Sequence, residues 1–423
     1  MNIVILATRI SGNDGVSLEC GHWKEILKKM GHEVGLVAGK LDQTGFLAPE
    51  LSFQSPNIMN LHDKVVYGKG SYRKIEEAIF REAGTIEGKL RSFFNNGRKH
   101  TDLLITSNTF SLPMHFPLAV ALARVIEELK LPTIARHHDF WWERKRYLRS
   151  DLFHFLKRWF PPDISFIKHV VINSIAQREL KKRTGINAEV IWDSFDFENK
   201  NIKKVDSFSK HFKSDFGIKE SDLVFLQATR IVPRKRLELS VEFMAKLKDK
   251  NSILVFAGHS GDEGKEYLKW IKRVCKKAKI RYKFVGNSIN SKRRIINLYN
   301  GEVPRRKRIY TLWDCYNNCD FVLYPTEIEG FGNQFVEAIY FKKPIIMTPY
   351  PVFEKDIKPM GFEVIEISEN FGVGVVNKVN RLVKDKKLYH RVVEKNFKIG
   401  KKYLSYTLVE KKLRKIFRKM KLV

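Results

Sequence analysis

The chain has 423 residues, of which 43% are hydrophobic and 12% aromatic, so it can form the cores of two or three globular domains. Its net charge of +31 favours anionic partners such as sugar diphosphates, phosphorylated acceptors, anionic lipid or nucleic acid, although scattered lysines are as typical of a solvated surface. No stretch has the length of a membrane span or the pattern of a signal sequence, and the four cysteines show neither a metal-binding spacing nor a disulfide framework. We therefore expect a cytoplasmic protein.

The first part of the chain predicts a doubly wound fold, in which apolar strands alternate with amphipathic helices. A weaker, strand-like pattern lies around residues 65–66. The expected strands cover residues 1–7, 34–38, 102–106, 133–135 and 170–174, and the expected helices cover residues 16–30, 72–95, 117–129 and 175–184.

Two glycines, Gly12 and Gly15, lie between the first strand and the first helix. A glycine loop at this position can offer backbone N–H groups to a phosphate at the edge of a parallel sheet. The spacing is not that of a dinucleotide-binding motif, so a dinucleotide is not favoured. Plain turn glycines are the alternative.

A polar and aromatic cluster, RHHDFWWER, follows the strand that ends at residue 135. Ligand sites of open parallel sheets gather where strands end. His137, His138 and Asp139 could bind a metal or perform acid–base chemistry, but no third ligand with a recognisable spacing follows, so a metal is less favoured. A structural histidine held by Asp139 is the other alternative. Arg144 and the two tryptophans could line an acceptor pocket or simply pack.

A second doubly wound domain is expected after residue 196. Its expected strands cover residues 223–228, 253–257, 282–285, 319–324 and 344–347, and its expected helices cover residues 237–247, 312–318, 333–341, 371–385 and 389–413. The basic segment 292–308 is expected to be a mobile loop or a contact for an acidic acceptor or a membrane. Residues 401–423 are amphipathic and basic, which also fits a membrane surface.

Arg230 and Lys235 lie in a basic loop between the first strand and the first helix of this domain. Paired cations at the start of a helix suit a diphosphate, and arginine can bind it through two parallel hydrogen bonds. A basic run is usually just solvated, so this interpretation depends on its place directly after a buried strand.

The most informative stretch is YPTEIEGFGNQFVEAIYFKKPIIMTP, residues 324–349. It places Glu329 in a glycine loop and Glu337 in the helix that follows. Glycines let the backbone approach a ligand closely, and the N–H groups that open the helix suit an anion. Carboxylates would repel a phosphate but would bind hydroxyl groups. The pattern therefore indicates a ligand with phosphate and polyol parts, such as a nucleotide sugar.

This stretch resembles the signature of retaining glycosyltransferase family 4, in which two glutamates are separated by seven residues. Arg230 and Lys235 also match the family's basic pattern, although Arg236 stands where the family has glycine. At the expected domain junction, Trp192 and Asp193 replace the usual Pro-Asn, which argues against a ligand role for Asp193. Asp196 is retained.

The resemblance implies an α/β GT-B enzyme with two Rossmann-like domains that face a cleft. An acceptor domain would cover residues 1–195 and a nucleotide-sugar domain residues 196–400. A final helix, 401–423, would cross back to the first domain.

The resemblance also implies roles for individual residues. Arg230 and Lys235 would hold the diphosphate, Glu329 would contact sugar hydroxyls and Glu337 the ribose. Phe331 and Gly332 would donate backbone N–H groups, and the nucleobase would lie near strand ends such as Gly258. His138, with His137 as its rival, would lie near the transferred sugar and the acceptor. No cofactor beyond the nucleotide diphosphate sugar is implied, and because the chain contains no Asp-x-Asp, a divalent metal is not expected to be essential.

Two further segments, DGVSLE and ARHHDFWWER, are similar to synthases of mannosylglucosylglycerate, a charged compatible solute. We therefore expect transfer of a hexose, with mannose favoured and GDP-mannose as the matching donor, to an anionic acceptor such as glucosylglycerate. A glycosyltransferase that acts on a lipid-linked or polysaccharide acceptor at the membrane surface is the alternative. A nucleic-acid-binding protein is the alternative from another class, and the sequence does not favour it because it shows neither a basic patch interleaved with aromatic residues nor a known binding module.

Overall fold

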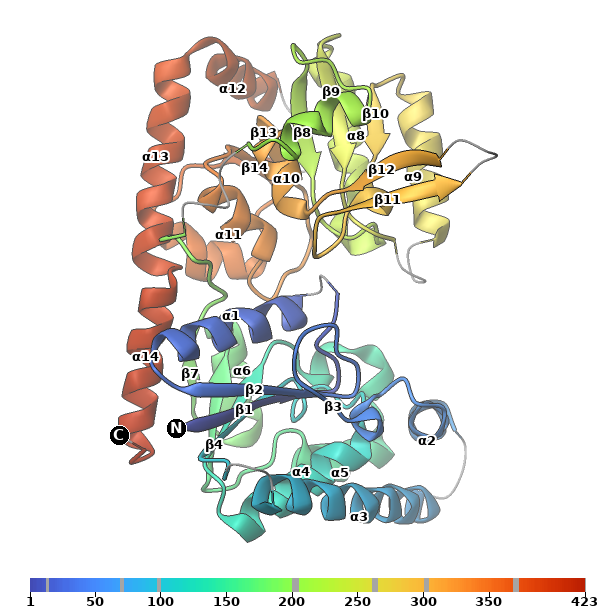
Figure 1. Cartoon of the computed structure of the whole chain (residues 1–423), viewed down its shortest axis with the longest axis vertical. Helices are drawn as coiled ribbons and strands as arrows, with labels where there is room; N and C mark the ends of the chain where they lie inside the picture. Colours follow the sequence, from blue (N-terminus) through green and yellow to red (C-terminus); the bar gives the residue numbers. More distant parts are fainter. Residues whose placement is uncertain are drawn as a thin grey trace. The chain divides into compact units, whose positions relative to one another are not determined.

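The computed structural model describes residues 1–12, 15–68, 72–96, 100–199, 205–260, 265–299, 304–367 and 373–422. They form two compact units (Figure 1). Unit 1 consists of Met1–Trp192 and Tyr406–Val423, and unit 2 consists of Asp193–Ser405. Among the described helices, none is both long and apolar enough to cross a membrane.

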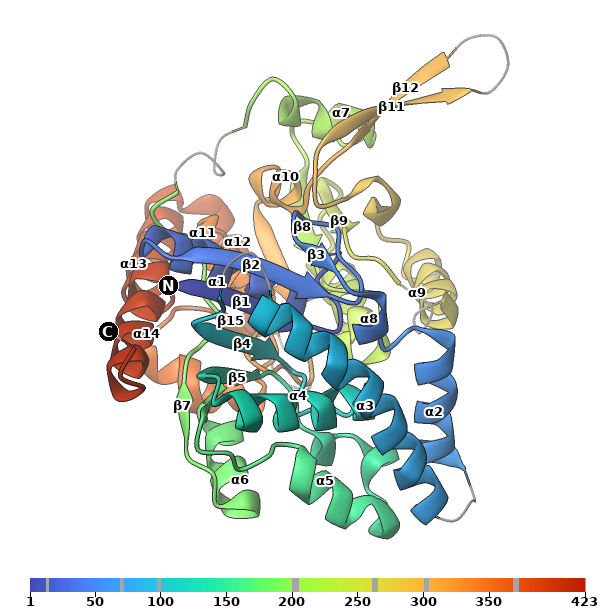
Figure 2. The ribbon, with the colours of Figure 1, turned by 60° about the horizontal axis from the view of Figure 1, so that its bottom comes forward.

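Unit 1 is built on a seven-stranded sheet with the order β3-β2-β1-β4-β5-β6-β7, in which every neighbouring pair is parallel. The central strands are continuous apolar runs because both faces of the sheet are covered by helices (Figure 2). The strands are β1 Asn2–Ala7, β2 Glu33–Ala38, β3 Phe46–Leu47, β4 Leu103–Ser107, β5 Thr133–His137, β6 Ile167–Val171 and β7 Ala188–Val190.

The helices of unit 1 bury two separate apolar cores, one on each face of this sheet. Helices α1 and α14 contribute to one core, and α2 to α6 contribute to the other. Their bounds are α1 Gly15–Lys29, α2 Pro56–Tyr67, α3 Tyr72–Asn96, α4 Phe116–Leu129, α5 Phe153–Trp159, α6 Ser174–Thr184 and α14 Tyr406–Lys419.

The strand-like pattern around residues 65–66 is wrong, because these residues belong to helix α2. Pro56 stands at its first position, where a missing N–H costs nothing. Ile58, Leu61 and Val65 then recur at helical spacing and are buried. Two adjacent valines are typical of a strand, but here they continue the helical spacing of the buried residues before them.

Helix α14 packs its apolar side into unit 1, where Val409, Leu413, Ile416 and Phe417 are all buried. Its polar side holds the last strand of the sheet, because Lys412 donates to the carbonyl of Val190 at 2.7 Å. Since the apolar side is already covered, α14 offers only its basic side to any other surface.

Unit 2 contains a six-stranded parallel sheet with the order β10-β9-β8-β13-β14-β15. The strands are β8 Leu223–Gln227, β9 Ser252–Phe256, β10 Tyr282–Phe284, β13 Phe321–Tyr324, β14 Ile345–Met347 and β15 Ile365–Glu366. The helices are α7 Phe212–Asp215, α8 Leu237–Leu247, α9 Lys265–Lys277, α10 Leu312–Asn317, α11 Asn333–Tyr340, α12 Val373–Lys384 and α13 Lys386–Tyr403.

The expected helix 389–413 is two helices, because the chain leaves α13 at Leu404 and enters unit 1 at Tyr406. The carbonyl of Leu404 accepts a hydrogen bond from the N–H of Phe195 at 3.0 Å, and this bond fixes the break.

The basic segment 292–308 forms an antiparallel hairpin of β11 Arg294–Tyr299 and β12 Pro304–Ile309 rather than a loop. Its base is held by carboxylates of unit 2: Arg293 pairs with Asp206 and Asp314, and Arg308 pairs with Asp215 at 3.1 Å. The hairpin extends away from the six-stranded sheet of unit 2 (Figures 1 and 2).

Candidate functional site

The candidate site of unit 2 lies where the strand order of its sheet reverses. From the central pair of β8 and β13, the strand order runs through β9 to β10 on one side and through β14 to β15 on the other. The loops that follow β8 and β13 leave the same edge of the sheet, because adjacent parallel strands end together. Such a switch point is where open parallel sheets bind ligands.

A buried ion pair joins these two loops. Lys235 ends a short 3-10 helix after β8, and its ammonium group hydrogen-bonds Glu329 Oε1 in the loop after β13. Thr326 Oγ1 donates to the same carboxylate at 2.9 Å, and Arg234 lies 3.8 Å from its other oxygen. The side chains of Lys235 and Glu329 are only 8% and 11% exposed.

The charges of this pair are set by burial and by each other. Burial alone would raise the pKa of Glu329, but the charge and hydrogen bond of Lys235, with help from Arg234, hold that pKa below its ordinary value. Burial lowers the pKa of Lys235, against the attraction of Glu329. Glu329 is therefore ionised at neutral pH and held in one orientation.

Arg230 and Arg236 flank Lys235 in the loop after β8. Arg230 is exposed and forms no ion pair with any residue that the structure describes. Arg236, which replaces a glycine of the family pattern, has φ +47° and directly precedes α8. It therefore adopts the left-handed conformation that favours glycine.

The glycine loop continues from Glu329 into α11. Gly332 precedes the first residue of this helix with φ +117°, and Phe331 is buried. Glu337 lies one turn into α11, and its Oε2 atom accepts a hydrogen bond from Tyr316 at 2.8 Å. The structure thus gathers Lys235, Glu329, Phe331 and Gly332 at the ends of two neighbouring strands.

Gly258 lies after β9, at a point where two loops cross. A Cβ atom at this position would lie 1.8 Å from the carbonyl oxygen of Thr229, so no larger residue fits. The backbone carbonyl of His259, the next residue, accepts a hydrogen bond from the N–H of Ile231 at 3.0 Å. Packing against the loop after β8 therefore explains this glycine, and a nucleobase contact there stays a prediction.

The candidate site of unit 1 also lies at strand ends. His138 follows β5, and its Nε2 atom lies 3.3 Å from Ser107 Oγ at the end of β4. Asn108 Oδ1 accepts from the backbone N–H of His138 at 2.7 Å. Burial, with a smaller effect of Arg136, lowers the pKa of His138 to about 3, so its ring is neutral at physiological pH.

The neighbours of His138 have other partners. His137 belongs to β5, is 1% exposed, and bonds His169 Nδ1 through Nε2 at 2.9 Å. Asp139 pairs with Arg144 at 2.9 Å, so the contact that orients the His138 ring comes from Ser107 rather than from Asp139. Among the residues described, no group of three His, Cys, Asp or Glu side chains is arranged to hold a metal ion.

Sequence reasoning missed a buried charged network beneath His138. Arg136 Nη2 donates to Glu19 Oε2 of α1 at 2.8 Å, and His22 lies 2.9 Å from the other oxygen of this carboxylate. Burial would raise the pKa of Glu19, but Arg136 and His22 lower it to about 2. The available signal was an arginine inside an apolar strand and a glutamate on the apolar side of a helix.

The glycines after β1 have different environments. The N–H of Gly12, where φ is +77°, donates to Asp42 Oδ2 at 2.7 Å. This backbone N–H, one of those that the glycine loop could offer to a phosphate, is therefore already hydrogen-bonded to a carboxylate. Gly15 is exposed and begins α1.

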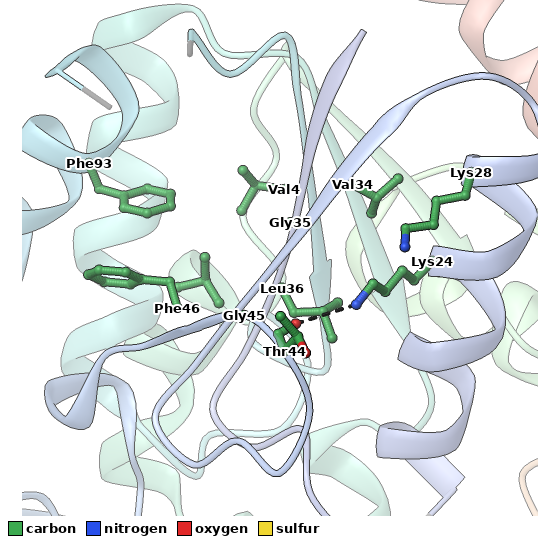
Figure 3. A pocket seen from close by; sticks show the side chains of 11 residues that line it. Val4, Lys24, Lys28, Val34, Gly35, Leu36, Thr44, Gly45, Phe46 and Phe93 are labelled. Atoms are coloured by element: carbon green, nitrogen blue, oxygen red, sulfur yellow. Dashed lines mark hydrogen bonds between the residues drawn. The ribbon is translucent and has the colours of Figure 1, made fainter. Parts of the chain in front are cut away.

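A pocket of about 510 Å³ lies at the outer edge of the sheet of unit 1, beside β2 and β3 (Figure 3). Lys24 and Lys28 of α1 lie on one side of it, and Phe46 and Phe93 lie on the other. Lys24 donates to the carbonyl of Thr44 at 3.4 Å. The pocket contains none of the predicted site residues.

Comparisons with known proteins give consistent matches. Residues 301–399 match the family model for glycosyl transferases group 1. The chain is 33% identical to a mannosylglucosylglycerate synthase of Thermotoga maritima, with 97% of this chain and 98% of that protein covered. It is also 33% identical to a mannosylglucosylglycerate synthase of Petrotoga mobilis, over 87% and 86% of the two chains.

Solved structures of several glycosyltransferases share the fold. Anabaena HepE in complex with UDP-glucose gives a TM-score of 0.66 at 12% identity, over 99% of this chain and all of that one. Sucrose-phosphate synthase from Thermosynechococcus elongatus gives a TM-score of 0.65 at 12% identity, over 99% and 98% of the two chains.

The ion pair predicts a characteristic pattern of stability. Lys235→Met should lower the free energy of unfolding by roughly 3 kcal/mol, because it leaves a buried carboxylate without its partner. Lys235→Met/Glu329→Gln should recover part of that loss. Arg234→Ala, at a half-buried and more distant cation, should cost less than about 1 kcal/mol. Urea unfolding at neutral pH measures all three, and equal losses in the single and the double variant would contradict the pairing.

The buried histidines of unit 1 predict a loss of stability in mild acid. Burial lowers the pKa of His138 to about 3 and those of His115 and His169 to about 4. Between about pH 6.5 and 4 the unfolded chain therefore binds protons that the folded chain does not, and the free energy of unfolding falls as the pH falls. Each histidine contributes up to about 1.4 kcal/mol per pH unit.

His115→Asn tests this pH dependence. Asparagine can still cap α4, where His115 accepts from the N–H of Leu118. The variant should flatten the pH dependence of urea unfolding between pH 6.5 and 4.5, and His154→Asn, at an exposed histidine, is the matched control. Parallel curves for wild type and His115→Asn would show that His115 is not held neutral.

Proposed function

Because the chain belongs to the group 1 glycosyltransferases of the GT-B fold, we propose that it transfers mannose from GDP-mannose to glucosylglycerate with retention of the anomeric configuration. The observation that carries this proposal is the 33% identity, over 97% of the chain, to a relative named mannosylglucosylglycerate synthase. An acceptor that carries a carboxylate also agrees with the net charge of +31.

Arg230 is the main ligand of the donor diphosphate in this proposal. It lies in the loop that follows the central strand β8, it is exposed, and no described residue neutralises it. Lys235 adds less, because its charge is already balanced by Glu329. As the bond between the anomeric carbon and the diphosphate breaks, negative charge builds on the diphosphate, and Arg230 stabilises it without reorganisation.

Glu329 binds hydroxyl groups of the transferred sugar, and Glu337 binds the ribose of the nucleotide. The support for Glu329 is its ionised state and fixed orientation, because a carboxylate held by Lys235 and Thr326 still offers lone pairs to hydroxyl donors. The support for Glu337 is its place one turn into α11, the helix that begins directly after Gly332.

The acceptor binds to unit 1. His138 is proposed to position the sugar and the acceptor, because its Nδ1 atom has no hydrogen-bond partner among the described residues and its ring is neutral. Arg144, whose side chain is 43% exposed and paired with Asp139, is proposed to meet the acceptor carboxylate. Gly12 and Gly15 remain candidate contacts at the edge of the same sheet.

The alternative acceptor, a lipid-linked or polysaccharide substrate at a membrane surface, gains no support from α14. The apolar residues of this helix are buried in unit 1, and only its basic side faces outward. A soluble small-molecule acceptor needs no such surface.

The first test is a transfer assay. Purified chain should convert glucosylglycerate and GDP-mannose to a product that is heavier by one hexose, detected by mass spectrometry. Of a panel of nucleotide sugars, GDP-mannose should raise the melting temperature most, since a bound donor stabilises by mass action.

Activity should persist in EDTA, because the sequence lacks Asp-x-Asp and Arg230 supplies positive charge to the diphosphate. Transfer to other acceptors but not to glucosylglycerate would contradict the acceptor assignment, and complete loss in EDTA would contradict metal independence.

The second test is His138→Ala. A hydrogen bond that strengthens in the transition state raises turnover rather than affinity. The variant should therefore lose about a hundredfold in turnover at saturating donor while the affinity for the donor changes little. His137→Asn, at the interior histidine bonded to His169, should retain turnover if the chain stays folded. The reverse pattern would assign the role to His137.

A further inference from the structure

Two buried tyrosines lie beneath the glycine loop of unit 2. Tyr324 ends β13 and Tyr350 follows β14, and each is 1% exposed. Their ring centroids are 6.0 Å apart at an interplanar angle of 83°. Both hydroxyl groups converge on one point, because a Cβ atom built on Gly332 would lie 2.6 Å from Tyr350 Oη and 2.7 Å from Tyr324 Oη. Only glycine fits above them.

Tyr350 also binds the loop directly. Its hydroxyl donates to the carbonyl oxygen of Phe331 at 2.5 Å, inside the protein. In a planar trans peptide the carbonyl and the N–H point in opposite directions. The bond to Phe331 therefore turns the N–H of Gly332 away from the tyrosines, and this N–H has no hydrogen-bond partner among the described residues.

The orientation of this peptide is not fixed by the local sequence. Glycine accepts positive and negative φ almost equally, so the Phe331–Gly332 peptide can rotate at low cost if nothing holds it. After such a rotation the loop would present a carbonyl oxygen where it now presents an N–H, and an oxygen of a ligand would be repelled. The Tyr350 hydroxyl is the group that selects one orientation.

We propose that Tyr350 is a positioning residue, whose hydroxyl holds the Phe331–Gly332 peptide so that the N–H of Gly332 donates to an oxygen of the bound donor. This inference rests on the proposed function. The oxygen belongs to a phosphate or to a sugar hydroxyl, and both accept a hydrogen bond in the same way. A donor that is fixed before the ligand arrives stabilises charge without reorganisation.

The test compares Tyr350→Phe with Tyr310→Phe. Tyr310 is also fully buried, and its hydroxyl donates to Asp215 at 2.7 Å, at the base of the hairpin and outside the proposed site. Both variants lose one buried hydroxyl and should lose similar stability in urea. Only Tyr350→Phe should lower turnover at saturating donor, by about ten- to a hundredfold. Turnover within twofold of wild type together with unchanged affinity for the donor, or an equal loss of turnover in Tyr310→Phe, would overturn the proposal.

Calorimetric titration with GDP identifies the oxygen. If Tyr350→Phe lowers the affinity for GDP itself, the N–H of Gly332 binds a phosphate oxygen. If the affinity for GDP is unchanged and only the affinity for the nucleotide sugar or its turnover falls, it binds a sugar hydroxyl. Either result supports the positioning role, and no change in GDP affinity, nucleotide-sugar affinity and turnover overturns it.

A second variant, Gly332→Ala, tests the link between Tyr350 and the peptide directly. Gly332→Ala introduces a methyl group against both hydroxyls and should displace the peptide. Its cost in turnover should be smaller in the Tyr350→Phe background, because the orientation is already lost there. Independent, multiplicative effects would contradict the link between the two residues.

The proposal and the acceptor assignment can fail separately. If wild type transfers no hexose to glucosylglycerate, the acceptor assignment fails. The Tyr350 comparison is then made on binding and slow hydrolysis of the nucleotide sugar, neither of which needs an acceptor.

Discussion

The buried contact between Lys235 and Glu329 is the constraint on which the candidate site of unit 2 depends. It joins two loops that lie 94 residues apart in the sequence and leave adjacent strands. Two further hydrogen bonds accompany it: the backbone N–H of Glu327 donates to the carbonyl of Arg234 at 3.1 Å, and the guanidinium group of Arg234 donates to the carbonyl of Ile328 at 3.3 Å. Because desolvation offsets much of the attraction between buried charges, we interpret the pair chiefly as a device that fixes loop position. The positions of Arg230 and of the glycine loop depend on this contact, because they lie in the two loops that it joins.

Much of this arrangement could be predicted from the sequence, for a physical reason. Parallel strands covered on both faces are continuous apolar runs, so their ends are marked by the first polar residues. The strands that precede Arg230, His138 and Glu329 were located in this way, and the structure has a strand at each place. The matches to glycosyltransferases confirm the fold class and the reaction class that the motif at Glu329 and Glu337 indicated. The roles of the individual residues stay predictions.

The features that the sequence did not reveal depend on contacts between distant residues. Glu19 and Arg136 are 117 positions apart, and each alone reads as an ordinary charged residue. Neither strand of the β11–β12 hairpin has an alternating pattern of apolar and polar residues that would indicate it, and in α2 two adjacent valines obscure a longer helical period. Tyr350 gave no signal at all, since its partner is a backbone carbonyl.

The return of α14 to unit 1 has a consequence for the order of synthesis. Residues 1–192 leave the ribosome first, but α14, which completes the apolar core that contains Ile3, Ile5 and Trp23, arrives only after residues 193–405. At typical elongation rates this interval lasts about 10 to 40 s, during which an apolar face stays open. A nascent chain in that state is a natural client for a chaperone, and a stop codon before residue 406 would make the exposure permanent.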